Sequence, residues 1–162
     1  TAVAMHVCRY DVLVEGLSHD SEHVRMHSAA ALGEMASGAG QAVSELAVAL
    51  GDSSEKVRRT VAESLGMIQQ PESETVPALI EAMRDPDDQA RFNAVLSLAR
   101  IAPESAEVVS ALSRALRDEN RYVRAYAAEV LRRVGSVGAS EVLLDHLMAS
   151  RWCPVTSGGR LF

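Results

Sequence analysis

The sequence of 162 residues is poor in aromatic residues, which make up 4% of it, and in cysteine, of which it has two. The scarcity of aromatics argues against a β-sandwich, whose strands favour aromatic and β-branched residues. Cys8 and Cys153 lie near opposite ends of the chain, so we expect two unpaired thiols. No apolar run approaches the roughly 20 residues that span a bilayer, and no signal-peptide pattern opens the sequence. We therefore expect a soluble, cytoplasmic protein without a membrane partner.

An excess of positive charge is also absent, because 16 Lys and Arg residues are outnumbered by 22 Asp and Glu residues. The resulting net charge of −6 gives no basic field to hold a phosphate backbone, so we expect no nucleic-acid partner. Apolar residues nevertheless make up 48% of the chain, which excludes a disordered tail. Alanine, leucine and valine dominate, and this composition favours closely packed helices.

What the sequence does contain is a repeat of 33 residues, clearest in the stretch from Leu50 to Ile68. A small or β-branched anchor residue recurs in each copy, an arginine follows it directly, and a leucine stands eight residues further on. The anchors are Val24, Val57, Ala90 and Val123; the arginines are Arg25, Arg58, Arg91 and Arg124; the leucines are Leu32, Leu65, Leu98 and Leu131. A fixed period of this kind predicts stacked units that bury their apolar faces against one another.

Hydrophobic spacing and turn residues predict paired helices in every copy. The expected pairs are 3–17 with 22–36, 41–50 with 55–68, 75–84 with 89–101, and 106–117 with 121–134. A capping helix at 139–150 and an irregular tail at 151–162 should follow, so that residues 1–150 form one repeat domain. We expect Trp152 to pack back over the capping helix, the competing outcome being a homodimer through this end of the chain.

The residues of the repeat identify a family. The set Leu50, Asp52, Val57, Arg58, Ala62, Leu65, Gly66 and Ile68 resembles the short HEAT-like repeats named after phycobilisome lyases, and the resemblance covers nearly the whole chain. The resemblance implies an all-α fold, a right-handed α-solenoid of four HEAT-like helical hairpins plus a C-terminal capping helix. For function it implies a scaffold.

The turn between the two helices of a repeat carries an aspartate, at Asp52, Asp85 and Asp118. An acid there can cap the second helix and pair with an arginine of the same or the adjacent repeat. We therefore assign the aspartates to a structural ladder with Arg25, Arg58, Arg91 and Arg124. The first repeat has His19 at this position, and Asp20 beside it is expected to substitute. Other turn acids, Asp87 and Asp88 among them, are expected to be solvated.

Chemistry that requires a metal or a nucleophile finds no support in the sequence. The chain resembles deoxyhypusine hydroxylases in fold, but those enzymes bind iron through repeated His-Glu pairs, and the corresponding place here holds His27-Ser28 and no such pair in later repeats. The histidines share no recurring ligand spacing, and no phosphate loop or nucleophile elbow appears. We expect no catalytic residue, no metal and no cofactor.

Positions that vary between the fixed ones predict a binding surface, because on helices they fall on one side across the stack. We expect a non-enzymatic scaffold that binds a protein or peptide on the concave face of the second helices; for Phe92 a core position between helices is the alternative. Two other functions stay open: a bilin or tetrapyrrole lyase-like accessory subunit, and a regulatory segment of a larger enzyme. The predicted binding residues are His23, Met26, Lys56, Arg59, Glu63, Gln89, Phe92, Leu96, Tyr122, Glu129 and Arg133.

Overall fold

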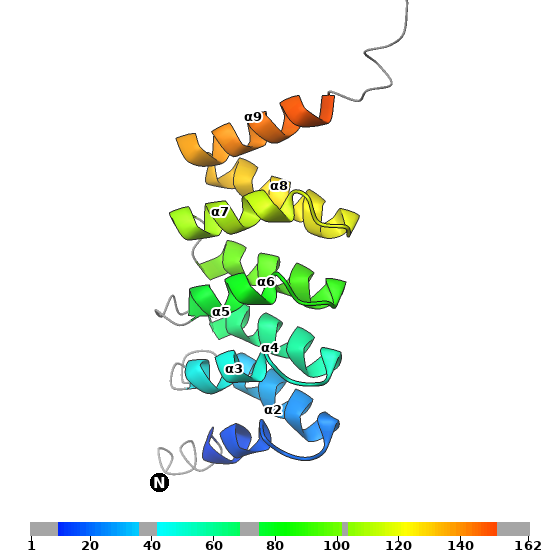
Figure 1. The fold of residues 1–162 in the computed structure, drawn as a ribbon. Coiled ribbons are helices and arrows are strands. Elements are labelled where there is room, and N and C mark those ends of the chain that lie inside the picture. Colours follow the sequence, from blue (N-terminus) through cyan, green and yellow to red (C-terminus); the bar gives the residue numbers. More distant parts are fainter. Residues whose placement is uncertain (1–9, 36–41, 69–74, 102–103, 152–162) are drawn as a thin grey trace, which may run out of the picture. The chain divides into compact units, whose positions relative to one another are not determined.

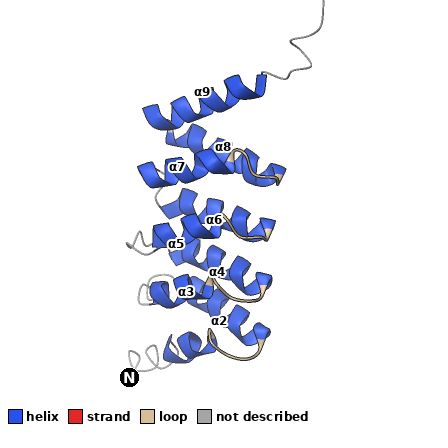
Figure 2. Ribbon diagram, in the orientation of Figure 1, coloured by secondary structure: helices blue, strands red, loops and turns tan. Residues whose placement is uncertain are grey.

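A computed structural model describes residues 10–35, 42–68, 75–101 and 104–151, and within these ranges the chain consists of helices and short turns without strands (Figures 1 and 2). The all-α prediction is confirmed. The chain divides into two compact units, Thr1–Pro103 and Glu104–Phe162. The expectation of one repeat domain over 1–150 stays a prediction, and the packing predicted for Trp152 lies outside the described residues.

The helices follow the expected pairs closely. In the first unit residues 10–16 are helical, followed by α2 (Glu22–Glu34), α3 (Val43–Ala49), α4 (Glu55–Ile68), α5 (Thr75–Ala82) and α6 (Asp88–Ile101). The second unit contains α7 (Ala106–Ala115), α8 (Arg121–Val134) and α9 (Val137–Arg151). Helices α4 and α8 have the predicted bounds, whereas α3, α5 and α7 are shorter because their last residues turn toward the second helix.

Stacked second helices form the core of the first unit. Helix α4 packs between α2 and α6, while α3 and α5 cover the other side of the layer (Figure 1). The leucines eight residues after the anchors, Leu32, Leu65 and Leu98, are fully buried. Because each repeat presents the same leucine to the same interior layer, one 33-residue pattern fills the core of every repeat.

Close approach between second helices depends on paired glycine and serine residues. Ser64 Oγ donates a hydrogen bond to the carbonyl of Ala29 at 2.8 Å, and Ser97 Oγ donates to that of Ala62 at 2.7 Å. A Cβ atom added to Gly33 would lie 2.8 Å from the Cα atom of Ser64. The repeat motif recognised in the sequence includes Gly66 and the fully buried Ala62, but not the serines that take part in this contact.

The second unit is one hairpin with an added helix. Leu112 and Leu131 are fully buried between α7 and α8, and Gly135 ends α8 in the left-handed conformation at φ 60°. Helix α9 packs on both α7 and α8 and buries Ala139. On α9, Val142 and Leu143 are half-buried, whereas Leu147 is 56% exposed.

Candidate protein-binding surface

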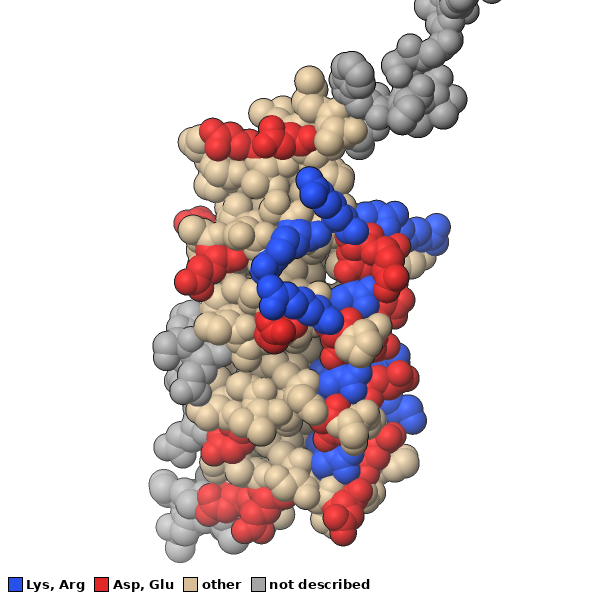
Figure 3. Space-filling model, in the orientation of Figure 1, with Lys and Arg blue, Asp and Glu red and all other residues tan. Residues whose placement is uncertain are grey.

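Arginine and aspartate side chains join successive repeats of the first unit at the turn edge. Arg58 Nε lies 2.7 Å from Asp85 Oδ2 and Nη2 lies 2.9 Å from Oδ1, a two-pronged contact that spans 27 residues of sequence. Arg25 binds Asp52 in the same way, at 2.6 and 2.9 Å. Figure 3 shows the result as basic and acidic side chains alternating along this edge of the unit.

The same arginines also bind the turn of their own repeat. Arg58 Nη1 donates to the carbonyls of Asp52 at 2.9 Å and Ser53 at 3.3 Å. The equivalent pair of bonds is present at Arg25, Arg91 and Arg124. The guanidinium of Arg58 therefore fixes two turns. Its Nη1 atom binds backbone carbonyls in the turn of its own repeat, and its Nε and Nη2 atoms bind the aspartate in the turn of the next repeat.

The ladder carboxylates also cap the helices that follow them. Asp52 Oδ1 accepts a hydrogen bond from the backbone N–H of Ser54 at 2.7 Å, and Asp85 and Asp118 do the same two residues on. Arg25 lowers the pKa of Asp52 below its usual range, chiefly by hydrogen bonding. These contacts keep the carboxylate charged and its turn closed.

In the first repeat His19 itself takes the place of the aspartate. Its Nδ1 atom accepts a hydrogen bond from the backbone N–H of Ser21 at 2.9 Å, the contact that the aspartate makes elsewhere. Asp20 contributes its backbone carbonyl, which accepts from Arg25 Nη1 at 3.0 Å. The expected substitution by the Asp20 carboxylate is therefore wrong, because an imidazole nitrogen can accept the same bond.

A second ion pair runs beside the ladder and corrects the expectation for Asp87. This carboxylate is only 9% exposed rather than solvated. Its Oδ2 atom lies 2.7 Å from Arg59 Nε and accepts a further bond from the backbone N–H of Ala90. Arg59, predicted as a binding residue, thus has its guanidinium bound to the next repeat. The bond from Arg59 lowers the pKa of Asp87.

The predicted binding residues of the first unit, Arg59 included, lie on α2, α4 and α6, which pack side by side. We call the eight predicted residues of these helices the second-helix face: His23, Met26, Lys56, Arg59, Glu63, Gln89, Phe92 and Leu96. The position before each anchor is exposed, at His23, Lys56 and Gln89. Glu63 is exposed, whereas Phe92 is half-buried, as are Met26 and Leu96. Exposed polar side chains therefore alternate with half-buried apolar side chains on this face.

Hydrogen bonds and an ion pair hold the polar part of this face in place. Lys56 Nζ on α4 lies 3.2 Å from Glu22 Oε1 on α2. Asn93 Nδ2 donates to the carbonyl of Arg59 at 3.0 Å, and Gln89 Nε2 donates to Asn93 Oδ1 at 2.9 Å. The sequence pattern did not identify Asn93, although its place three residues after the anchor could have done so.

The second unit carries the other three predicted binding residues, on α8. Tyr122 is 59% exposed, and the guanidinium carbon of Arg121 lies 4.7 Å from its ring centroid. Glu129 pairs with Arg132 at 2.7 Å, and Arg133 is exposed. A flat aromatic ring under a cation is a surface that suits peptide contacts.

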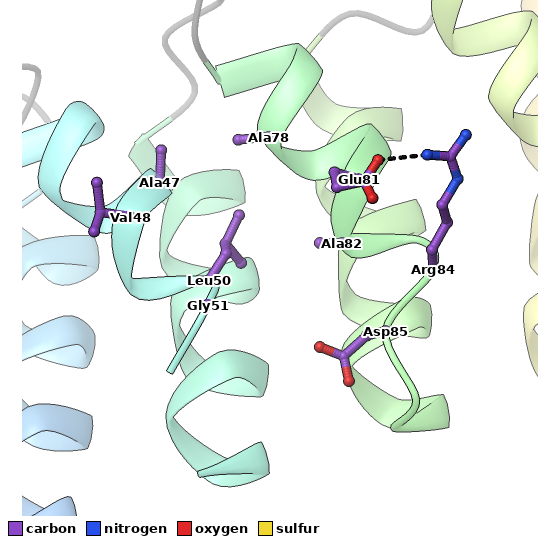
Figure 4. Close-up of a pocket in the computed structure, with 9 residues that line it drawn as sticks. All are labelled: Ala47, Val48, Leu50, Gly51, Ala78, Glu81, Ala82, Arg84 and Asp85. Carbon is purple, nitrogen blue, oxygen red and sulfur yellow. Dashed lines mark hydrogen bonds and ion pairs between the residues drawn. The ribbon is translucent and has the colours of Figure 1, made fainter. Parts of the chain in front are cut away.

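A groove of about 510 Å³ separates α3 from α5 on the first-helix side of the first unit. Small apolar residues line it, and Figure 4 shows Leu50 and Ala82 facing the space between the helices while Glu81 turns toward Arg84. The nitrogen and oxygen atoms of that pair are 2.6 Å apart. Val48 at the margin is 80% exposed. The groove is thus a second place where an apolar group could bind.

Two features of the described residues bear on other functions. Among these residues, no three His, Cys, Asp or Glu side chains are grouped so that they could hold a metal ion. Over the same ranges, no helix has the length and apolar character needed to cross a bilayer.

Comparison with known families places these features in context. The family model for HEAT repeats matches residues 10–91 and 76–152. A search of curated proteins found no match.

Solved structures with the same fold were also found. The structure of an engineered protein matches with a TM-score of 0.65 and 21% identity, over 85% of this chain and 68% of the other. A designed armadillo repeat protein matches at 0.61 with 20% identity, over 83% and 68%. The complex of CpcE and CpcF of phycocyanin lyase from Nostoc sp. matches at 0.63 with 18% identity, over 90% and 66%. At these identities the likeness concerns the fold alone, and the predicted fold class, an α-solenoid of HEAT-like repeats, is confirmed.

Proposed function

Because the chain belongs to the HEAT-repeat family, we propose that it is a non-enzymatic protein-binding scaffold whose second-helix face binds an extended segment of another protein. The observation that carries the proposal is the contrast between two sets of positions on the same helices. The ladder and the glycine–serine contacts recur from repeat to repeat with the same geometry. The neighbouring exposed positions differ in every repeat.

Differences between repeats matter because they give a partner a direction and a register. Reading along the stack, the positions before the anchors present an imidazole at His23, an ammonium at Lys56 and an amide at Gln89, all exposed. The half-buried side chains of Met26 and Phe92 offer apolar contacts beside them. Aromatic and methionine side chains are enriched in protein interfaces. An extended segment that alternates apolar and polar side chains fits this face.

Rigidity supports the same proposal. A surface whose side chains are already fixed loses less conformational entropy when a partner binds. The side chains of Gln89 and Asn93 hydrogen-bond each other, and Asn93 also binds the backbone of the preceding repeat. Lys56 is placed by Glu22. The face is therefore preorganised in the free protein.

Affinity capture with the full chain tests the proposal. Lys56→Ala combined with Gln89→Ala removes two exposed contacts at little cost in stability, and it should abolish capture of those partners that bind the second-helix face. Val48→Ala, on α3 and equally exposed, is the matched control and should leave the same partners bound. Partners lost with Val48→Ala but retained by the double variant would place the binding surface on the first-helix groove and overturn the proposal.

Phe92→Ala is the most informative single change. Its half-buried ring is expected to contact the partner, so binding should weaken while the protein stays folded. A protein that unfolds on this substitution, together with unchanged capture by the Lys56 and Gln89 variants, would assign Phe92 to the core and remove the centre of the face. Circular dichroism recorded on the same samples distinguishes the two results.

The groove between α3 and α5 favours a second candidate, binding of a tetrapyrrole or similar apolar group. Ligand pockets combine an apolar lining with a few polar groups, and the groove has Ala47, Leu50 and Ala78 along its walls and Glu81 with Arg84 at its margin. Titration with a bilin or with haem is the test. An unchanged absorption spectrum excludes this candidate, whereas a shift that Ala82→Trp abolishes would establish it.

A further inference from the structure

Arg25 and Arg58, two ladder arginines of the first unit, each have two binding edges, and both edges are occupied. In Arg58, Nη1 donates to backbone carbonyls of its own turn, at 2.9 Å for Asp52. Nε and Nη2 bind the carboxylate of Asp85 in the following repeat, at 2.7 and 2.9 Å. Arg25 repeats this geometry with Asp52. Two independent copies thus define what a complete ladder step looks like in this protein.

Arg124 on α8 has only half of this arrangement. Its Nη1 atom donates to the carbonyls of Asp118 at 2.7 Å and Glu119 at 2.8 Å, so the guanidinium is fixed by its own turn as in the other repeats. Within the part of the chain that the structure describes, no carboxylate accepts from its Nε and Nη2 atoms. The residue 33 positions after Asp118 is Arg151, which cannot accept. Among the described residues, this preoriented donor edge is therefore open.

The helix surface beside this edge is open as well. Ala128 occupies the register position of Ala62, which is fully buried under α6, yet Ala128 is only half-buried and Ala125 is exposed. Helix α9 packs on α7 and α8 in the way that a first helix does, and no described helix covers this side of α8 within the second unit.

We propose that Arg124 binds a carboxylate of another protein, supplied by an aspartate in the turn before a helix that packs on α8. A guanidinium fork selects carboxylate by charge and by its paired donors, and Asp52 and Asp85 provide the pattern twice within this chain. In that pattern the aspartate also accepts the N–H of the residue two positions on, which closes the turn. The partner therefore presents Asp-x-x at a helix start.

A second copy of this chain does not fit the role. Asp52 and Asp85 are already bound by the copy's own arginines, and Asp118 is also engaged. The first turn carries His19, whose Nδ1 atom accepts from Ser21 and whose ring offers no carboxylate. Because the ladder aspartates of the described residues are all engaged, the occupant we propose is a different protein. This surface consists of residues that are not part of the second-helix face, so the two proposals succeed or fail independently.

The test uses a peptide with the sequence of residues 52–63, in which a covalent staple replaces the side chains of Lys56, which is exposed, and Thr60, which is half-buried. The peptide carries Asp52 in its natural turn and ends before Ser64, whose close approach to Gly33 has no counterpart on α8, where Arg132 stands in that register. Circular dichroism first establishes that the peptide is helical. The full-length protein, labelled with nitrogen-15, is then titrated while the Nε–H signal of Arg124 is followed.

We expect the Arg124 Nε–H signal to move on titration and the Asp52→Asn peptide to bind roughly tenfold more weakly, as loss of a charged hydrogen-bond partner implies. Arg124→Lys should weaken binding of the Asp peptide to a similar extent, whereas Arg133→Ala, an exposed arginine of the same helix, should leave it unchanged. Equal binding of the Asp and Asn peptides, or no binding of the helical peptide, overturns the proposal. So does self-association of the free protein that Arg124→Lys abolishes, since a second copy would then be the occupant.

Discussion

Removal of the Asp85 carboxylate should destabilise the protein far more than removal of an exposed acid. Asp85 and Arg58 are 7% and 14% exposed in their side chains, and two bonds of 2.7 and 2.9 Å join them. Asp85→Ala leaves the guanidinium partly buried without its counter-charge and also removes the acceptor for the backbone N–H of Asp87. The energetic cost comes chiefly from the charge that remains.

The size of the effect follows from burial. Breaking one side of a buried ion pair costs about 3–5 kcal/mol, whereas exposed pairs contribute about 0–1 kcal/mol. The pair between Glu81 and Arg84 is exposed, at 71% and 58%, and serves as the control. We expect Asp85→Ala to lower the free energy of unfolding by about 3 kcal/mol or more and Glu81→Ala by less than about 0.5 kcal/mol.

Urea unfolding followed by circular dichroism measures both changes, and a double-mutant cycle identifies the pair itself. Arg58→Met keeps most of the side-chain volume while removing the charge. Combining it with Asp85→Ala removes both charges, so the double variant should be less destabilised than the sum of the single variants by about 2 kcal/mol or more. If the single costs simply add, or if Asp85→Ala costs no more than Glu81→Ala, the ladder does not hold the repeats together.

Three further predictions concern other parts of the fold. Gly66→Ala places a Cβ atom 2.9 Å from the Cα atom of Ser97 and should lower the free energy of unfolding by about 1–3 kcal/mol, although alanine has the better helix propensity. Gly138→Ala, where no atom lies near the added Cβ, should raise the free energy of unfolding by up to about 1 kcal/mol. Thermal melting compares the two variants. His19→Ala removes the acceptor for the backbone N–H of Ser21 and should lower the free energy of unfolding by about 1 kcal/mol, whereas His19→Asp should leave it unchanged. A lower free energy of unfolding in both variants would contradict the capping role of His19. Arg59 lowers the pKa of Asp87, so the stability that this pair contributes is complete above the ordinary aspartate pKa of about 3.9 and is lost as the pH falls through the lowered pKa. Asp87→Asn should therefore reduce the loss of stability at acid pH, as measured by urea unfolding at a series of pH values.

Sequence reasoning predicted the second helices better than the first ones, and the reason is physical. Helices α4 and α8 carry the full motif, with an acidic turn before them and a buried leucine inside. The sequence therefore indicates where each of these helices begins and ends. Helices α3 and α5 have 7 and 8 residues, and their last turns lead directly into the aspartate. Because a short helix contributes few apolar positions, its periodicity fixes its ends less well.

For the candidate site, the repeat pattern could predict which positions are exposed but not which side chains pair with each other. The exposed row at His23, Lys56 and Gln89 follows from helical geometry alone. The pairing of Arg59 with Asp87 does not, because it joins residues 28 positions apart and depends on how far one helix is displaced along the next. Sequence spacing likewise left open whether a ladder arginine binds its own turn or the adjacent one, and the structure shows that it binds both.

Structural and binding positions can be separated because the repeats use little of each helix for holding together. In α4 the partly or fully buried contacts to neighbouring repeats include those of Arg58 and Arg59 at the turn edge and of Ser64 and Gly66 between the helices. Exposed positions such as Glu63 take no part in these contacts and can change without loss of the fold. Within the second-helix face, Arg59 takes part in both roles, because its guanidinium is bound to Asp87 while the side chain remains 34% exposed. A partner that recruits Arg59 must either accept its remaining donors or compete with a carboxylate already in place, and the first course leaves the repeat contact intact.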